Sequence, residues 1–220
     1  MIRNLAAEFI GTALLLIGVA GSGIMGDTLS GGNTAIALLA NAIATGCMLY
    51  VIITTLGPIS GAHFNPVVTA YFALTAGFAK SQVVPYWIAQ IAGGIIGVWL
   101  THLMFDLDIL QLSTTNRTGP NQWSSEVIAT FGLLFVIIGG LKSKPDAVPS
   151  LVALYITGAY WFTSSTSFAN PAVSIARGLS DTFAGINPTH IAGFIIAQML
   201  GLALACLVLP KLFRDTSSSL

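Results

Sequence analysis

Six long apolar stretches, separated by shorter polar segments, dominate the chain. A transmembrane helix needs about 20 mostly apolar residues to cross the ~30 Å hydrocarbon core of a bilayer. The segments that meet this requirement are the following six: 4–26, 34–57, 82–104, 122–141, 146–164 and 188–210. The pattern therefore predicts an all-α membrane protein with six transmembrane helices.

Two asparagine-proline motifs interrupt this pattern, and each is followed by an apolar segment too short to span a membrane. Residues 65–76 and 170–179 give about 15–18 Å of helix at 1.5 Å per residue, roughly half of the hydrocarbon core. Asparagine is a favoured N-cap, and proline is favoured at the first helical position. Two membrane half-helices are therefore predicted to start at the motifs Asn65-Pro66-Val67 and Asn170-Pro171-Ala172.

The segments before the two motifs, "GPISGAH" and "TSSTSFA", predict irregular backbone at membrane depth. Lipid does not tolerate irregular backbone unless it is buried in protein or lines a water-filled cavity. Both loops are therefore expected inside the protein, beside a wet path. A third pair, Asn187-Pro188, directly precedes a full span and is predicted only to open it.

The chain contains an internal duplication. Three features recur in the same order in both halves, namely Glu8 and Glu126, the two Asn-Pro motifs, and Gln90 and Gln198. Each half holds three spans, an odd number, so the second half starts on the opposite side of the membrane. This predicts an inverted 3+3 repeat with its site where the halves meet. We assign a single domain to 1–220, with repeat 1 at 1–110 and repeat 2 at 120–214.

The composition agrees with a membrane protein and excludes other classes. Hydrophobic residues make up 55% of the chain, charged residues only 7%, and the mean hydropathy is +0.84. Eight basic residues balance eight acidic ones, so the chain lacks the basic footprint of a nucleic-acid-binding protein. The sequence has no HExxH or GxSxG motif, and we expect no catalytic residue, metal site or cofactor.

The basic residues gather on one predicted side of the membrane. Six spans place on that side Arg3, Lys80, Lys142, Lys144, Lys211 and Arg214, and on the other side only Arg117 and Arg177. Because loops rich in basic residues stay in the cytoplasm, we expect a multi-pass protein with both termini cytoplasmic.

The paired Asn-Pro motifs in a duplicated frame resemble the major intrinsic protein (aquaporin and aquaglyceroporin) family across essentially the whole chain. The first motif departs from the family's Asn-Pro-Ala by Val67, whereas the second keeps Ala172. The resemblance implies an aquaporin-like fold, with six helices around a narrow pore, two half-helices meeting at their N-termini, and a homotetramer. It also implies passive conduction of small neutral solutes and water across a bacterial-type inner (cytoplasmic) membrane.

Family members carry a selectivity filter, and counting from the motifs without gaps places it at Thr45, Gly158, Ser167 and Val173. Val173 stands where members usually have an arginine, so the resemblance implies a wide, arginine-lacking filter. Such a filter suits solutes larger than water, namely glycerol, urea and trihydroxy metalloids such as arsenite. Small filter residues with this valine resemble a bacterial aquaglyceroporin branch associated with arsenic resistance.

Four further polar residues have expected roles in or beside the pore. Arg177 lies one helical turn beyond the filter position, either as an outer-vestibule charge or as the ion-pair partner of Asp181, which we favour. The side chain of His63 lines the pore, or only its backbone faces solute. Glu8 and Glu126 are expected to brace the loop of their own half by accepting N–H bonds, with a proton relay as the alternative.

Two other functions stand as alternatives. A secondary transporter also uses inverted repeats with broken helices, but the sequence has no intramembrane acid beside either Asn-Pro motif to coordinate an ion. A strictly water-selective channel is the alternative within the family, and the small filter residues disfavour it. A channel is distinguished from a transporter by a low activation energy and by the absence of saturation.

Overall fold

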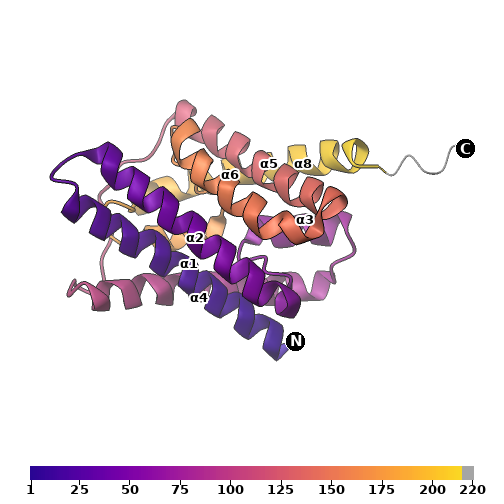
Figure 1. Cartoon of the computed structure of the whole chain (residues 1–220), viewed down its shortest axis with the longest axis horizontal. Helices are drawn as coiled ribbons and strands as arrows, with labels where there is room; N and C mark the ends of the chain where they lie inside the picture. The colour runs from indigo at the N-terminus through magenta and orange to yellow at the C-terminus, as the bar shows by residue number, and fades with distance from the viewer. Residues whose placement is uncertain (215–220) are drawn as a thin grey trace, which may run out of the picture.

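The computed structural model describes residues 1–214, which form a bundle of helices (Figure 1). In chain order these are α1 (Ile2–Leu29), α2 (Thr34–Ser60), α3 (Pro66–Thr75), α4 (Lys80–Met104), α5 (Pro120–Ser143), α6 (Val148–Phe162), α7 (Pro171–Arg177) and α8 (Ile191–Leu212). Two 3₁₀ turns, η1 (Pro145–Ala147) and η2 (Pro188–His190), directly precede α6 and α8. No β-strand occurs within residues 1–214, and the all-α prediction is confirmed.

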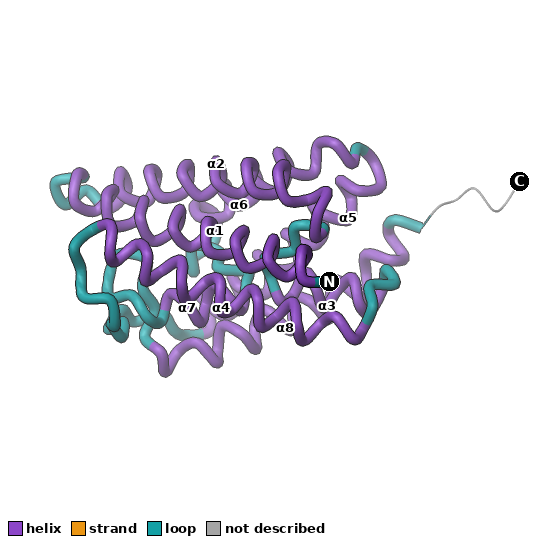
Figure 2. Tube along the Cα trace, turned by 90° about the horizontal axis from the view of Figure 1, so that it is seen from below, coloured by secondary structure: helices purple, strands orange, loops and turns teal. Residues whose placement is uncertain are grey.

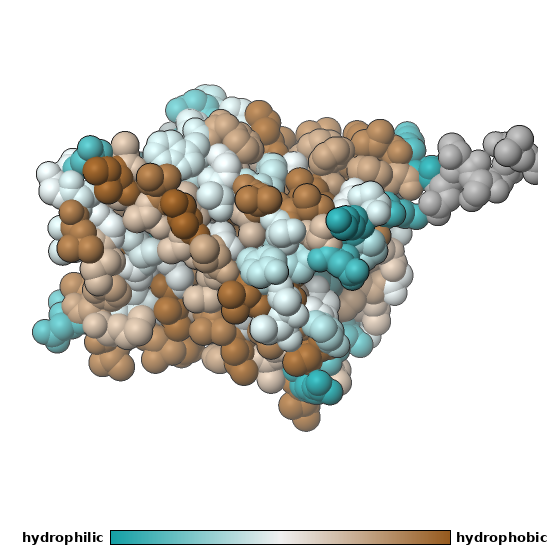
Figure 3. Space-filling model, in the orientation of Figure 1, coloured by the Kyte–Doolittle hydropathy of each residue, from teal (hydrophilic) through white to brown (hydrophobic). Residues whose placement is uncertain are grey.

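Five of the described helices are long and apolar enough to cross a membrane, namely α1, α2, α4, α5, and η2 with α8. The remaining predicted span, 146–164, is shorter than expected, since α6 has only 15 residues. Helix α6 is about 22 Å long at 1.5 Å per residue, and the 3₁₀ residues of η1 add about 6 Å. Together they approach the ~30 Å hydrocarbon core, and the chain is a multi-pass membrane protein. Hydrophobic side chains cover much of its surface, with the strongly hydrophilic ones toward the two ends (Figure 3).

The two halves of the chain pack in matching ways (Figures 1 and 2). Helix α1 packs against α2 and α4, and α5 packs in the same manner against α6 and α8. Helices α2 and α6 contact each other and join the halves. The short helices cross over, because α3 contacts α8 of the other half and α7 contacts α4. The start of α1 and the end of α8 lie toward the same end of the bundle (Figure 1), as an even number of crossings requires.

Glycines allow the long helices to approach closely at matching places in the two halves. A Cβ added to Gly97 would lie 2.3 Å from the carbonyl oxygen of Ala13, and one on Gly93 would lie 2.2 Å from another α1 carbonyl oxygen. In the second half, a Cβ on Gly201 would lie 2.7 Å from the carbonyl oxygen of Val127. Small residues at such crossings let membrane helices gain van der Waals contact along their backbones.

Both half-helices begin at the Asn-Pro motifs. Helix α3 starts at Pro66 and α7 at Pro171, and the preceding asparagine side chains accept N–H bonds from the first turns. The prediction of irregular backbone from residue 57 onward is wrong, because α2 continues to Ser60 despite an internal proline. It ends where Gly61 adopts a left-handed φ of 88°, so the first irregular loop is shorter than expected.

We expect Gly97→Ala to lower the free energy of unfolding by about 1–3 kcal/mol, the usual cost of overpacking. The added methyl group would meet the backbone of α1. Gly158→Ala is the matched control, because Gly158 is also helical but exposed, and its added Cβ would meet no atom closer than 3.8 Å. Thermal unfolding in detergent, followed by circular dichroism, measures both. Equal unfolding temperatures would show that the close α1–α4 crossing contributes nothing to stability.

Candidate functional site

The loops ahead of α3 and α7 enter the protein with the same unusual backbone. The angle φ is 50° at Ala62 and 48° at Phe64, and it is 51° at Ser167 and 48° at Ala169. These are matching positions, since each pair is separated by the same interval as the two Asn-Pro motifs. A left-handed conformation costs a non-glycine residue about 1–2 kcal/mol. Such residues persist only where the surrounding structure holds them, so both loops depend on their neighbours.

Glu8, on α1, holds the first loop from inside the protein. Its Oε1 accepts hydrogen bonds from Ser60 Oγ at 2.6 Å and from His63 N at 3.0 Å. Its Oε2 accepts from Phe64 N and from Gln90 Nε2, both at 2.7 Å. The side chain is fully buried, and its two oxygens serve four donors, an arrangement that suits an ionised carboxylate.

Glu126, on α5, holds the second loop with the same geometry. Its Oε1 accepts hydrogen bonds from Ser165 Oγ at 2.6 Å and from Phe168 N at 2.9 Å. Its Oε2 accepts from Ala169 N at 2.8 Å and from Gln198 Nε2 at 2.7 Å. Each half of the chain therefore folds its loop around its own buried glutamate, with its own glutamine completing the network.

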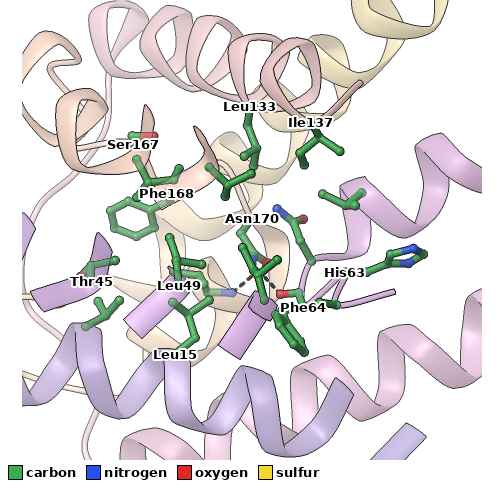
Figure 4. A pocket seen from close by; sticks show the side chains of 18 of the residues that line it. Leu15, Thr45, Leu49, His63, Phe64, Leu133, Ile137, Ser167, Phe168 and Asn170 are labelled. Carbon is green, nitrogen blue, oxygen red and sulfur yellow. Dashed lines mark hydrogen bonds between the residues drawn. The ribbon is translucent and has the colours of Figure 1, made fainter. Parts of the chain in front are cut away.

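The two asparagines join the halves where the half-helices meet. Asn65 Nδ2 donates to the carbonyl oxygen of Ala169 at 2.7 Å, and Asn170 Nδ2 donates to that of Phe64 at 2.8 Å (Figure 4). The Oδ1 atom of each side chain caps its own half-helix. A carboxamide has two N–H donors, so the cross-link leaves one N–H on each asparagine for other partners.

A cavity of about 130 Å³ runs along these loops between the two halves. This is well above the ~10–15 Å³ that one water molecule needs. Both asparagines line it. Apolar side chains from four long helices also line it, namely Leu15, Val19, Leu49, Ile53, Leu133, Ile137, Leu141, Val148, Val152 and Ile156 (Figure 4). The cavity thus combines an extensive apolar lining with a few hydrogen-bonding groups.

Three of the four residues predicted for the filter line this cavity, namely Thr45, Ser167 and Val173. All three are buried in the protein. The buried hydroxyl of Ser167 has no hydrogen-bond partner among the described residues. Because it belongs to a cavity-lining residue, this hydroxyl is a candidate contact for a solute or water.

The prediction of Gly158 as a filter residue is wrong. Gly158 is exposed on the outside of the bundle. Cavity-lining residues of α6 recur every fourth position, at Val148, Val152, Ile156 and Tyr160, and a helix of 3.6 residues per turn directs position 158 to the opposite face. Tyr160 lies in the wall instead, with its hydroxyl 3.2 Å from Thr45 Oγ1. A large aromatic side chain therefore stands where a glycine was expected.

Arg177 also lines the cavity, and its predicted ion pair with Asp181 is wrong. Arg177 is 2% exposed; its Nε donates to the carbonyl oxygen of Ala184, and its guanidinium carbon lies 3.5 Å from the ring centroid of Phe168. Asp181 is exposed and accepts hydrogen bonds from the backbone and hydroxyl of Thr114. The cavity wall is thus not free of arginine, although position 173 is valine.

His63 is half-buried and lines the cavity. Its ring stacks on Phe72, with ring centroids 5.1 Å apart and planes 6° apart, and its Nδ1 lies 3.1 Å from Thr69 Oγ1. Figure 4 shows it away from Ser167 and Phe168, toward the other end of the cavity. Of the two interpretations, the structure favours the side chain as part of the wall.

The loop between α4 and α5, which sequence reasoning left unassigned, packs against the segment that follows α7. Ser113 N donates to the carbonyl oxygen of Gly178 at 3.0 Å, and His102 Nε2, in the last turn of α4, lies 2.9 Å from Ser180 Oγ. In the same loop, Arg117 Nε donates to the carbonyl oxygen of Gly185 at 2.8 Å. Burial lowers the pKa of Arg117. No local pattern predicts these contacts, because each joins residues more than sixty positions apart.

The chain is similar to known proteins in sequence and in structure. Residues 1–164 match the family described as "Major intrinsic protein". Over 212 residues the chain is 52% identical to Aquaglyceroporin AqpS of Rhizobium meliloti (strain 1021), covering 96% of this chain and 91% of that protein. It is 34% identical over 198 residues to Aquaporin NIP2-1 of Oryza sativa subsp. japonica, covering 84% of this chain and 64% of that protein. Its fold is similar to the X-ray structure of the aquaglyceroporin from Plasmodium falciparum, with a TM-score of 0.75 at 18% identity, covering 96% and 98% of the two chains.

We expect Glu126→Gln to destabilise the protein. The amide nitrogen of glutamine would replace one carboxylate oxygen that now accepts hydrogen bonds, and it would face N–H or O–H donors instead. Each buried donor left without an acceptor costs roughly 1–3 kcal/mol. Asp27→Asn is the control, since Asp27 is an exposed carboxylate at the end of α1. Thermal unfolding in detergent measures both variants. A wild-type unfolding temperature for Glu126→Gln would mean that other contacts hold the second loop.

Proposed function

Since the chain belongs to the major intrinsic protein family, whose members are membrane channels and not enzymes, we propose that it conducts glycerol, urea and trihydroxy metalloids such as arsenite, together with water. That it is a channel for small neutral solutes follows from the family. The finer solute range is our proposal, and the relative that is 52% identical over nearly the whole chain is itself named an aquaglyceroporin.

The observation that carries this proposal is the two-sided chemistry of the cavity. Aliphatic side chains supply an apolar lining, and the Asn65 and Asn170 amides and the Ser167 hydroxyl supply hydrogen-bonding groups. A polyol carries its carbon chain and its hydroxyl groups on the same small molecule. It can therefore exchange water for hydrogen-bonding partners in the cavity while its CH groups contact the apolar lining.

We also propose that the backbones of the two loops before α3 and α7 form part of the path that solutes follow through the cavity. Left-handed residues such as Ala62 and Ser167 turn successive peptide groups in the two loops, and carbonyl oxygens of these loops offer acceptors to solutes in file. The N-termini of α3 and α7 meet at Asn65 and Asn170 and carry partial positive charge. A neutral hydroxylic solute crosses this region, whereas a cation meets an unfavourable field.

A second candidate, a water-selective channel, is favoured by one observation. Tyr160 and Phe168 both line the cavity near Thr45 and Ser167, so this end of the cavity is not lined by small residues alone. Two aromatic side chains reduce the room for a solute larger than water. The width of this end therefore decides between the two candidates.

We also propose the arrangement of the protein in its membrane. The channel is one domain of two inverted repeats, 1–110 and 120–214, as the matching networks around Glu8 and Glu126 support. Both termini face the cytoplasm of a bacterial-type inner membrane, which agrees with the start of α1 and the end of α8 lying toward the same end of the bundle. Four copies assemble as a homotetramer with one cavity in each subunit.

Stopped-flow light scattering on proteoliposomes, with water and with glycerol, tests the proposal. We expect both to cross rapidly in the wild type, with a low activation energy and no saturation. Val173→Arg should slow glycerol flux at least about tenfold, while water still passes. A tenfold slower flux requires a free-energy barrier to glycerol that is only about 1.4 kcal/mol higher. The buried position of Val173 in the cavity wall leaves little room for the larger side chain.

Water flow without glycerol entry in the wild type would establish the water-selective candidate instead. Saturable, steeply temperature-dependent glycerol entry would indicate a transporter. Gly158→Ala, a substitution outside the cavity, should conduct both molecules like the wild type.

A further inference from the structure

Two arginines at one end of the cavity bind three consecutive carbonyl groups of the same loop. Arg117 donates through Nη2 to the carbonyl oxygen of Phe183 at 3.3 Å and through Nε to that of Gly185 at 2.8 Å. Arg177 donates through Nε to the carbonyl oxygen of Ala184, which lies between them. The two guanidinium groups are therefore fixed relative to each other by residues 183–185, although one comes from the loop before α5 and the other from α7.

The ring of Phe168 lies against both arginines. The guanidinium carbon of Arg177 is 3.5 Å from its centroid, and that of Arg117 is 5.5 Å away. Both distances are within the ~6 Å range of cation–π attraction. The ring is packed edge-on against Phe194 at 4.9 Å and is itself buried. Phe168 is thus a platform for Arg177, and we call the three residues Phe168, Arg177 and Arg117 the outer stack.

The terminal nitrogens of Arg177 are free donors. A guanidinium carries five N–H donors, and the only hydrogen bond that Arg177 makes within residues 1–214 uses Nε. Arg177 is 2% exposed yet lines the cavity. Within the same residues, neither arginine of the outer stack forms an ion pair with a carboxylate. A buried and fixed cation without an ion-pair partner in this part of the chain therefore borders the cavity, and its Nη1 and Nη2 atoms make no hydrogen bond there.

The opposite end of the cavity carries an uncharged counterpart. His63 and Phe72 stack there, and they occupy the positions in the first half that correspond to Phe168 and Arg177 in the second. The internal duplication thus places two stacked planar side chains at each end of the cavity, but only the pair from the second half carries a permanent charge. This asymmetry is a property of the residues and not of the fold.

We propose that Arg177, lying on Phe168, is the solute-recognising and cation-excluding group of this channel, a role that position 173 cannot fill as valine. Its free Nη1 and Nη2 atoms bind the hydroxyl oxygens of neutral polyhydroxy solutes, and its charge repels cations. Phe168 and Arg117 are positioning residues that hold the guanidinium flat against the wall. The proposal rests on the function proposed above for the recognition of polyols, whereas cation exclusion applies to any solute range.

Potassium leak, glycerol flux and water flux, measured in proteoliposomes of Arg177→Gln, Arg177→Lys and Phe168→Leu, test this proposal. We expect Arg177→Gln to raise potassium permeability roughly tenfold to a hundredfold, as the loss of a unit charge a few ångströms from the path implies at intermediate dielectric. Arg177→Lys keeps the charge, so potassium leak should stay at the wild-type level. Its glycerol-to-water ratio should still fall several-fold, because an ammonium group cannot reproduce the planar fork and its stacking.

Phe168→Leu removes the platform but neither arginine, and we expect a lower glycerol-to-water ratio from a guanidinium that is no longer held. Arg3→Gln is the control, since Arg3 is an exposed arginine at the start of α1 and its loss should change none of the three rates. Unchanged potassium leak and an unchanged glycerol-to-water ratio in Arg177→Gln would overturn the proposal. If that variant does not fold, a wild-type ratio in Arg177→Lys overturns it equally.

These outcomes remain distinct from a failure of the proposed function. If the wild type conducts water but no glycerol, the polyol range is wrong, and polyol recognition by Arg177 is overturned with it. The potassium leak of Arg177→Gln still decides whether the outer stack excludes cations, because that measurement requires only an open water path.

Discussion

The structure depends on keeping irregular backbone hydrogen-bonded inside a membrane protein. Lipid offers no partner to a free peptide group, and each of the two loops contains non-glycine residues in the left-handed region. Buried Glu8 and Glu126 resolve both difficulties at once, since each accepts two backbone N–H bonds from its loop. The same carboxylates fix the direction of the loops, and thereby the position of the half-helices that follow.

Once the loops are held, the rest of the site follows from their meeting. Asn65 and Asn170 each cap one half-helix and donate to a carbonyl oxygen of the opposite loop. These reciprocal bonds tie the halves together beside the cavity and leave one N–H on each asparagine. On our proposal, a path for neutral solutes arises from the same groups that hold the loops, and the outer stack adds a permanent charge beside it.

Local sequence rules predicted the parts that depend on local chemistry. Asn-Pro before a short apolar segment predicts a capped half-helix because both residues act within one turn, and Glu8 and Glu126 stand out because charge is costly in a membrane. Counting residues back from the second Asn-Pro motif failed at Gly158. The residue of α6 that faces the cavity depends on how the helix is rotated, and the length of the loop that follows does not fix this rotation. The structure puts Tyr160 in the wall instead. The number of residues between two motifs therefore does not predict which side of a helix faces the cavity.

The sequence by itself determined the class of protein, the duplication, the two half-helices and the residues able to brace them. These follow from hydrophobic length, from repeated motifs and from capping, all of which act over short stretches of chain. Only the tertiary structure decided which groups Arg177 contacts. Spacing paired it with Asp181 on the same segment, whereas Phe168, Ala184 and the cavity wall surround it in the fold. A long side chain takes its partners from whatever packing brings within reach, and that packing is set by contacts between distant segments.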